Sequence, residues 1–449
     1  MCETLVKTEE FKDSPTEKMP EGWEVKPLRE IADLQVGFAF KSEWFQEHEG
    51  IRLLRGENVG YGSPDWSETR RLPWKMCPNY QEYELVAGDI IIGMDRTFTK
   101  SGFKISVLEP DDVPALLVQR VGRFIPINCD HQFLKVLLNS QEYHHALLAQ
   151  QKGMDIPHLS KTEILEPVVA VPPVDEQRQI AEILNTIDEA IAHTSSLIAK
   201  LKQMKAGLLH DLLTRGLDEN GELRDAIAHP EQFKPSLLGQ IPKEWEAEPF
   251  GEHIAQLDSG WSPVCDSEPA VNGERGILKT TAVVWSGYNP LESKKLPSNL
   301  QPRYQAVVEA DDILITRKGP RERVGVVVHI PLTPPQLMMP DTVFRVRLKE
   351  SSTLLPAFVP LTLGSIVVQR DWNRKKIGLA EAQVDINYGI VRETLIYIPP
   401  KPEQERIVGI INNYNTRIRA EEAYREKLKL QKQGLMHDLL TGKVRVKNA

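Results

Sequence analysis

Residues 172–180 read Pro-Pro-Val-Asp-Glu-Gln-Arg-Gln-Ile, and residues 399–407 read Pro-Pro-Lys-Pro-Glu-Gln-Glu-Arg-Ile. At the same spacing and without a gap, Gly-Leu-Leu-His-Asp-Leu-Leu-Thr at 207–214 returns as Gly-Leu-Met-His-Asp-Leu-Leu-Thr at 434–441. The chain therefore contains two copies of one unit, each a globular segment followed by a long helix. A duplicated chain of this kind has approximate two-fold symmetry and suits a target or partner that is itself two-fold.

The two repeated helical segments carry apolar residues at a heptad spacing. A period of about 3.5 residues predicts helices that bury one seam against a partner helix. The other copy is the natural partner, which gives an intramolecular pair. We expect this helix-pair seam to contain Ile180, Leu184, Ile187, Ile191, Ile198, Leu201, Leu208, Ile407, Ile411, Ile418, Leu428 and Leu435.

The repeat also divides the chain into parts. The openings at 20–23 and 242–245 each carry a proline and a tryptophan, and they mark where the globular segments begin. We expect a disordered N-terminal tail at 1–19, a first globular domain at 20–171, a helix at 172–216, a linker at 217–241, a second globular domain at 242–398 and a second helix at 399–445.

Both globular domains are predicted to be mixed α+β. Strand-like apolar runs at 88–92 and 311–315 correspond between the two copies. Helical patches are expected at 132–151 and 356–376. Outside such anchors the two domains differ in sequence, as expected if each copy recognises something different.

The composition sets broad limits. At 449 residues, 41% hydrophobic and 26% charged, the chain is too long for one core and is typical of a globular protein. It has no apolar run of the roughly 18 residues that cross a bilayer and no signal peptide, so we expect a cytoplasmic protein without membrane contact. The four scattered cysteines argue against a disulfide framework or a zinc site. The net charge of −8 does not exclude DNA binding, because an acidic protein can be basic locally.

The sequence lacks the short motifs of several enzyme classes. It contains no phosphate-binding Gly-x-x-x-x-Gly-Lys-Ser/Thr, no Gly-x-Gly-x-x-Gly after a strand, no Asn/Asp-Pro-Pro-aromatic and no His-Glu-x-x-His. The His-His pair at 144–145 is interpreted as a solvated helix face, and the Asp-Asp pair at 311–312 as a turn before a strand. The His-Asp pairs at 210–211 and 437–438 are interpreted as helix ends with favourable charge placement. We predict a non-catalytic chain without a metal site.

Polar and basic residues gather on expected loops of both globular domains. Arg and Lys neutralise phosphates, and Arg and Asn can bind base edges. The loop after the matching strand is basic in both copies, at 96–104 and 317–323, which favours DNA contact there over a merely solvated turn. The candidate DNA-binding residues are Lys41, Arg55, Asn58, Arg96, Thr97, Thr99, Lys100, Lys104, Lys279, Thr280, Thr281, Arg317, Lys318, Arg321, Arg323, Arg374 and Lys375.

Taken together, these motifs resemble a known family. Two copies of Pro-Pro-x-x-Glu-Gln-x-x-Ile, each leading a helix that ends Gly-Leu-(Leu/Met)-His-Asp-Leu-Leu-Thr, are similar to the specificity subunits of type I restriction-modification systems. The domain openings and the segments at 88–90 and 312–314 resemble the target-recognition domains of that family. The resemblance covers essentially the whole chain after residue 19.

The resemblance implies two α+β target-recognition domains separated by an antiparallel coiled coil of two helices. Each domain would read one half of a bipartite, asymmetric double-stranded DNA target. The helix pair would set the spacer and bind two methyltransferase (modification) subunits, and restriction subunits would complete a translocating nuclease. S-adenosylmethionine, ATP and Mg²⁺ would then be bound by the partners and not by this chain. An adaptor that binds only proteins, or an enzyme with an atypical site, remains an alternative.

Overall fold

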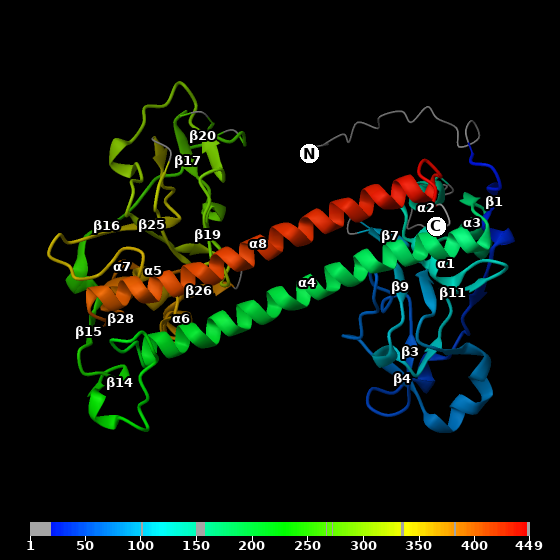
Figure 1. Ribbon diagram of the computed structural model, residues 1–449, viewed down its shortest axis with the longest axis horizontal. Helices are drawn as coiled ribbons and strands as arrows, with labels where there is room; N and C mark the ends of the chain where they lie inside the picture. Colours follow the sequence, from blue (N-terminus) through cyan, green and yellow to red (C-terminus); the bar gives the residue numbers. More distant parts are fainter. Residues whose placement is uncertain are drawn as a thin grey trace. The chain divides into compact units, whose positions relative to one another are not determined.

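The computed structural model describes residues 19–99, 102–149, 158–265, 267–271, 273–333, 336–380 and 383–446 (Figure 1). The chain divides into two compact units. Unit 1 consists of Met1–Thr194 and Tyr424–Ala449, and unit 2 of Ser195–Ala423. Each unit therefore contains one globular part together with portions of both long helices.

Unit 1 contains two four-stranded sheets. The first has the order β2-β11-β6-β9 and is antiparallel throughout, and the second has the order β4-β3-β10-β5 with β3 and β10 parallel. A ribbon of β1 and β12 and the short pair β7–β8 complete the strands. The bounds are β1 Glu24–Pro27, β2 Ala32–Val36, β3 Ile51–Leu54, β4 Arg70–Leu72, β5 Glu84–Leu85, β6 Ile90–Gly93, β7 Phe98–Thr99, β8 Gly102–Phe103, β9 Ile105–Val107, β10 Ala115–Leu117, β11 Val121–Pro126, β12 Val168–Val171, α1 His131–Leu138, α2 Gln141–Leu148 and α3 Lys161–Leu165.

Unit 2 repeats the antiparallel sheet, in the order β16-β25-β21-β23, beside a smaller sheet β20-β17-β24 in which β17 and β24 are parallel. A second three-stranded sheet, in the order β22-β27-β26, and the short pairs β13–β14, β15–β28 and β18–β19 complete the described strands. The bounds are β13 Phe233–Ser236, β14 Gly239–Pro242, β15 Glu246–Pro249, β16 Ile254–Ser259, β17 Gly276–Leu278, β18 Val283–Val284, β19 Gly287–Tyr288, β20 Ser293–Lys295, β21 Ile313–Thr316, β22 Lys318–Gly319, β23 Val327–His329, β24 Leu337–Met338, β25 Val343–Leu348, β26 Ile377–Ala380, β27 Gln383–Asp385, β28 Leu395–Ile398, α5 Val359–Leu363, α6 Ile366–Lys375 and α7 Tyr388–Glu393.

The matching apolar runs form the strands that divide each unit's core. In β6, Ile90 and Ile92 face the core that contains α1 and α2, while Ile91 faces a second core around Leu54 and Val121. Strand β21 places its residues in two separate cores in the same alternating way. Because side chains alternate along a strand, a strand buried on both faces must be apolar at every position.

An arginine occupies the same register position in the two antiparallel sheets. Arg123 of β11 lies opposite Ile91 and Gln35, and its guanidinium binds Gln35 and, at 3.2 Å, the carboxylate of Asp89. In unit 2 the corresponding Arg345 lies opposite Leu314 and Asp258. The repeated unit therefore shares a polar anchor as well as its topology.

Arg345 is the more deeply buried of the two arginines, with 1% of its surface exposed. It donates to Asp258 at 2.8 Å and to the carbonyl oxygens of Gln305 and Val307 at 2.8 and 2.6 Å. Asp312, the buried acid of the Asp-Asp pair, accepts from Arg347 at 2.6 Å and from the backbone N–H of Glu309. The pair thus forms the turn before a strand that the sequence predicts, with its second acid paired to β25.

The two long helices are α4 (Val174–Thr214) and α8 (Lys401–Leu440). The glutamine of each Pro-Pro-x-x-Glu-Gln motif has the same structural role at the start of its helix. The Gln177 side chain donates to the carbonyl of Pro172 and accepts from the N–H of Asp130, both at 2.8 Å. Gln404 makes the equivalent bonds to Pro399 and Leu355, also at 2.8 Å. Each motif therefore ties a helix start to its own globular core.

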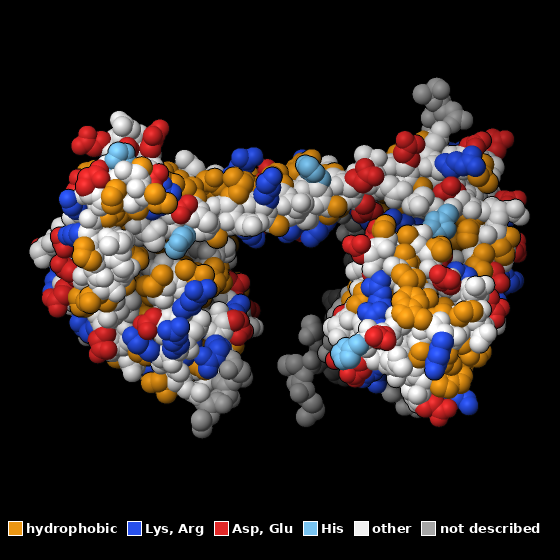
Figure 2. Space-filling model, turned by 90° about the horizontal axis from the view of Figure 1, so that it is seen from below, with side chains coloured by type: hydrophobic (Ala, Val, Ile, Leu, Met, Phe, Trp, Pro, Cys, Tyr) orange, Lys and Arg blue, Asp and Glu red, His pale blue; other side chains and the backbone are white. Residues whose placement is uncertain are grey.

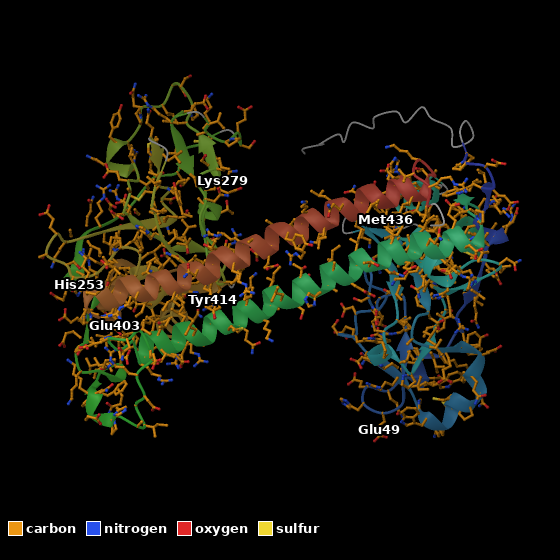
Figure 3. All side chains as sticks on the ribbon, in the orientation of Figure 1. Glu49, His253, Lys279, Glu403, Tyr414 and Met436 are labelled. Carbon is orange, nitrogen blue, oxygen red and sulfur yellow. The ribbon has the colours of Figure 1, made fainter. Side chains whose placement is uncertain are left out.

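The glutamate of the second motif forms a helix-end cluster in unit 2. Glu403, at the start of α8 beside the end of α4 (Figure 3), accepts from the Trp245 indole at 2.9 Å and from Arg224 at 2.8 Å. Gly216 has a φ of +67°, and a Cβ there would lie 2.4 Å from a Glu403 carboxylate oxygen. Only glycine fits this backbone conformation and this contact.

Unit 1 has its own helix-end cluster. Glu176 accepts from the Trp23 indole at 3.0 Å and from Arg445 at 2.8 Å. Burial raises the pKa of the Glu176 carboxyl, but the hydrogen bonds from Arg445 and Trp23 outweigh this and hold the pKa below its usual value. Gly442, just beyond the end of α8, has a φ of +72°, which is positive as in Gly216 of unit 2. The motif glutamate of each helix therefore binds an arginine that follows the other helix.

The proposed seam residues are all buried or partly buried. In unit 1, Lys432 of α8 pairs with Asp188 of α4 at 2.6 Å, and in unit 2 Lys202 of α4 pairs with Glu422 of α8 at 2.7 Å. Within each unit the helices therefore lie side by side and run in opposite directions (Figure 1). The outer seam positions belong to globular cores, which the heptad alone does not predict: Ile180, Leu184, Ile407 and Ile411.

Two expected helical patches are each broken into two helices. The patch at 132–151 forms α1 and α2, because Ser140 caps a new start by accepting from the N–H of Tyr143. The patch at 356–376 forms α5 and α6, with Ser365 capping the second in the same way. The segment expected to be a plain linker contains the antiparallel hairpin of β13 and β14.

The interpretation of His144 as part of a solvated face is wrong. Its ring stacks on Phe103 with centroids 4.0 Å apart, and its Nε2 lies 2.9 Å from the carbonyl oxygen of Leu138. The adjacent His145 is exposed. Burial lowers the pKa of His144 from 6.5 to about 4.

This shift predicts a pH dependence of stability. Between pH 6.5 and about 4 the unfolded chain binds a proton at His144 that the folded chain does not, so stability falls as the pH falls through this window and is fully present above it. Urea midpoints measured at pH 7 and pH 5 should therefore differ more for the wild type than for His144→Gln. The control His145→Gln should behave as the wild type, and an equal loss in all three proteins would contradict the assignment.

Candidate nucleic-acid interface

The basic loop after β6 is anchored on its first side by Asp95. The carboxylate accepts from Arg120 at 2.9 Å and lies 2.6 Å from Nδ1 of His158. Burial raises the pKa of the Asp95 carboxyl, but the hydrogen bonds from His158 and Arg120 outweigh this and hold the pKa below its usual value. Asp95 therefore stays ionised and holds the loop to two other segments of unit 1.

Thr97 anchors the other side of the loop. Its hydroxyl is buried and donates to the carbonyl of Gly93 at 2.6 Å, and its own carbonyl accepts from the N–H of Lys104 at 2.7 Å. The Lys104 ammonium in turn donates to the carbonyl of Gly56 at 3.1 Å. Thr97 and Lys104 thus fix the loop between them to the rest of unit 1.

A cavity of about 540 Å³ lies against this loop. Its walls carry four cationic side chains and two carboxylates, with apolar contacts from two phenylalanines and a valine. The lining residues are Phe40, Ser42, Phe45, Arg55, Gly56, Glu57, Asp95, Arg96, Lys104, Val118, Gln119 and Arg120. The structure therefore brings three candidates to one site: Arg55, and Arg96 and Lys104 of the basic loop.

Two candidates in unit 1 are structural instead. Asn58 is 1% exposed, and its amide donates to the carbonyl oxygens of Asp65 and Glu68 at 2.9 and 3.2 Å. Thr97 is fully buried with its hydroxyl engaged as described above. Expecting these two side chains to contact DNA was wrong, because polar side chains buried in this way satisfy backbone groups.

The remaining candidates of unit 1 differ in setting. Lys41 is exposed and lies 5.5 Å from the ring centroid of Trp44. Arg55 is ion-paired with Glu57. Lys100 and the side chain of Thr99 lie outside the described residues.

In unit 2 the corresponding loop is held by an acid that sequence reasoning missed. Asp385 of β27 lies 3.1 Å from the Arg317 guanidinium and 4.0 Å from the Lys318 ammonium. The guanidinium also lies over the ring of Phe344, 4.7 Å from its centroid. A period-two pattern around residue 385 indicates a strand, but nothing local shows which loop that strand meets.

Three further candidates of unit 2 bind neighbouring side chains. The Lys279 ammonium lies 3.7 Å from the carboxylate of Glu292, and the Thr281 hydroxyl donates to it at 2.6 Å. The Thr280 and Thr342 hydroxyls are 2.8 Å apart. Glu292 therefore binds Lys279 and Thr281, while Thr280 is bound separately by Thr342.

Arg321 and Arg323 follow β22 in the basic turn. The Arg321 guanidinium donates to the carbonyl of Asn373 at 3.2 Å, which joins the turn to α6. The carbonyl of Arg323 accepts from the Thr316 hydroxyl. The turn is therefore bound to neighbouring elements at both arginines.

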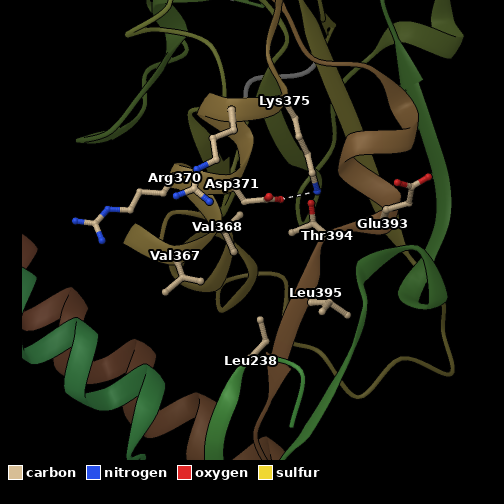
Figure 4. A pocket seen from close by; sticks show the side chains of 10 residues that line it. Leu238, Val367, Val368, Arg370, Asp371, Lys375, Glu393, Thr394 and Leu395 are labelled. Carbon is tan, nitrogen blue, oxygen red and sulfur yellow. Dashed lines mark ion pairs between the residues drawn. The ribbon is translucent and has the colours of Figure 1, made fainter.

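The two candidates on α6 line a cavity of about 440 Å³ in unit 2 (Figure 4). Its walls are largely apolar, with Leu238 and Val367 among them. Lys375 pairs with Asp371 one helical turn earlier, at 2.7 Å. Among the residues that the structure describes, Arg374 has no ion pair, so it is the α6 candidate with an unneutralised charge.

Lys and Arg side chains on the displayed face lie among Asp and Glu rather than in one broad basic field (Figure 2).

Within the described ranges, no three His, Cys, Asp or Glu side chains are placed to hold a metal ion. No helix of the described part is long and apolar enough to cross a membrane.

Comparison with known proteins identifies a family domain in the first part of the chain. Residues 20–203 match the family described as the type I restriction modification DNA specificity domain. The type I restriction enzyme MjaVIII specificity subunit of Methanocaldococcus jannaschii is 34% identical over 206 residues. That alignment covers 45% of this chain and 48% of the relative, so it spans about half of the relative's length.

Two other proteins match over nearly the whole chain. The putative MjaX specificity subunit of the same organism is 23% identical over 98% of both chains. The crystal structure of the S subunit of a type I restriction-modification system from M. genitalium covers 95% of this chain and 99% of that chain, with a TM-score of 0.57 at 14% identity. This structural likeness shows a shared fold. Residues 20–203 therefore carry a type I restriction modification DNA specificity domain, and the chain as a whole is similar to the specificity subunits that its repeated motifs indicate.

Proposed function

We propose that this chain is a non-catalytic subunit that directs a type I restriction-modification complex to its DNA target. Each globular domain reads one half of a bipartite, asymmetric sequence. The observation that carries the proposal is the duplication: two units share sheet topology, a register-matched arginine and a helix-end cluster, while their loops differ. A shared scaffold with different loops suits two readers of different half-sites.

We also propose that α4 and α8 form an antiparallel coiled coil that sets the spacer between the half-sites. A helix of 41 residues is about 60 Å long. Half-sites read from one face of B-DNA lie roughly 34 Å apart. Two methyltransferase subunits dock on the helix pair, and they and the restriction subunits bind S-adenosylmethionine, ATP and Mg²⁺.

The test is single-molecule methylation mapping of DNA from cells that express this chain with the methyltransferase subunit of its system. We expect a bipartite, asymmetric methylated motif that is absent when this chain is omitted. The purified chain alone, given Mg²⁺ or S-adenosylmethionine, should neither cut nor methylate DNA. A stable complex with the methyltransferase but no motif would overturn the proposal and favour the protein-binding adaptor.

A further inference from the structure

Two arginines at the unit 1 cavity hold backbone conformations that residues with a Cβ rarely adopt. Arg96 has a φ of 48° and Arg120 a φ of 64°. The described part of the chain contains five non-glycine residues with positive φ, and these two line the same cavity. Such conformations cost about 1–3 kcal/mol and persist where the surroundings enforce them, which is common at ligand-binding sites.

The surroundings of Arg96 explain how its conformation is enforced. Asp95 before it is held by Arg120 and His158, and Thr97 after it is held by Gly93. The residue between two such anchors has little freedom in its own backbone. The loop therefore presents the Arg96 side chain from a fixed base, at the cavity wall.

Arg96 is the one cation of this cavity for which the described residues provide no partner. Arg55 pairs with Glu57, Lys104 donates to a backbone carbonyl, and Arg120 pairs with Asp95. No hydrogen bond or ion pair within the described residues engages the Arg96 guanidinium, and the side chain is exposed. An unpaired guanidinium on a fixed backbone is preorganised for a ligand, because little ordering is left for binding.

The mixed charge of the cavity favours a base edge over a phosphate. Glu57 and Asp95 line it together with the cations, and carboxylates repel a phosphate group. A G·C pair presents both kinds of group in the major groove, since guanine O6 and N7 accept and cytosine N4 donates. Arginine binds guanine O6 and N7 with two parallel hydrogen bonds, and carboxylates accept from cytosine N4.

We infer that Arg96 reads a guanine in the half-site recognised by unit 1, and that the cavity beside it is the subsite for that G·C pair. This inference rests on the proposed function. It adds to that function one specificity-determining residue, its base and its half-site.

The experiment is methylation mapping with the complete chain and its methyltransferase, comparing the wild type with Arg96→Ala and Arg96→Lys. Both variants lose the two-pronged guanidinium, so we expect the preference for guanine at one position of one half-site to fall roughly 10- to 100-fold. The other half-site should keep its sequence. Arg29→Ala, which removes another exposed arginine of unit 1 that pairs with Glu166, should leave the whole motif unchanged.

The outcomes separate this inference from the proposed function. If the wild type yields no bipartite motif, the proposed function itself fails. If the wild type yields its motif and Arg96→Ala leaves every position unchanged, only the inference about Arg96 is wrong. A uniform loss of methylation with an unchanged motif would mean a phosphate contact and would also overturn it.

A further variant distinguishes the loss of base reading from misfolding. Arg96→Gly should fold at least as stably as the wild type, because glycine adopts a φ of 48° without strain. It should nevertheless lose the guanine preference as Arg96→Ala does. Arg96→Gly with an intact guanine preference would contradict the inference.

Discussion

Replacing Glu403 by alanine is expected to lower the free energy of unfolding of unit 2 by about 3–5 kcal/mol, because it leaves a buried charge without its partner. The Arg224 side chain is 9% exposed, and both Glu403 carboxylate oxygens accept from it. The same carboxylate accepts from the Trp245 indole and from the N–H of Leu217. Urea denaturation followed by tryptophan fluorescence measures the loss.

Unit 1 offers a matched control for that prediction. Glu176→Ala removes the equivalent carboxylate and its bond to Trp23, but the Arg445 side chain is 40% exposed and water can solvate it. We therefore expect the free energy of unfolding of unit 1 to fall by less, about 1–3 kcal/mol. The double variant Glu403→Ala with Arg224→Met should recover part of the lost stability, since it removes both charges. Equal costs for the two single variants would show that burial of the arginine is not the cause.

Replacing Arg345 by methionine is the second change with a large expected effect. It should lower the free energy of unfolding of unit 2 by about 3–5 kcal/mol as well. The variant strands the Asp258 carboxylate and leaves the carbonyl oxygens of Gln305 and Val307 without their donor. Asp258 lies on β16, in the same sheet as β21, the strand that precedes the basic loop of unit 2. Native-state hydrogen exchange should show the amides of β21 and β25 losing protection together.

Arg123→Met in unit 1 is the corresponding control. The Arg123 side chain is 17% exposed, against 2% for Arg345, so water can reach the Gln35 and Asp89 side chains that the variant leaves without their donor. We expect this variant to lower the free energy of unfolding of unit 1 by about 1–3 kcal/mol. Should Arg123→Met cost as much as Arg345→Met, the extra buried hydrogen bonds of Arg345 would contribute nothing measurable.

Sequence reasoning succeeded where the pattern was local. A heptad period and paired prolines predict α4 and α8 to within a few residues, because a helix buries whatever recurs every three to four positions. Runs such as Ile90 to Ile92 predict buried strands for the same reason. The serine caps at 140 and 365 were also readable locally, and they would have divided the two helical patches.

It failed where a role depends on a contact that the local pattern does not show. Asn58 looks like a base-reading amide, yet its hydrogen bonds bury it within its own loop. Asp385 neutralises Arg317, which lies 68 residues away in sequence. The candidate site in unit 1 is therefore only partly predictable, since a list of basic residues does not say which of them are already paired.

The sequence by itself determined the duplication, the two long helices and the family resemblance, because these are carried by periodicity and by motifs that recur in order. Only the tertiary structure decided which arginines are structural and which are free. Arg345 is committed to the Asp258 carboxylate and Arg224 to the buried Glu403 carboxylate, whereas Arg96 stands unpaired among the described residues at a cavity wall. The physical reason is that pairing and burial depend on contacts across the chain, which folding creates between residues that no local pattern relates.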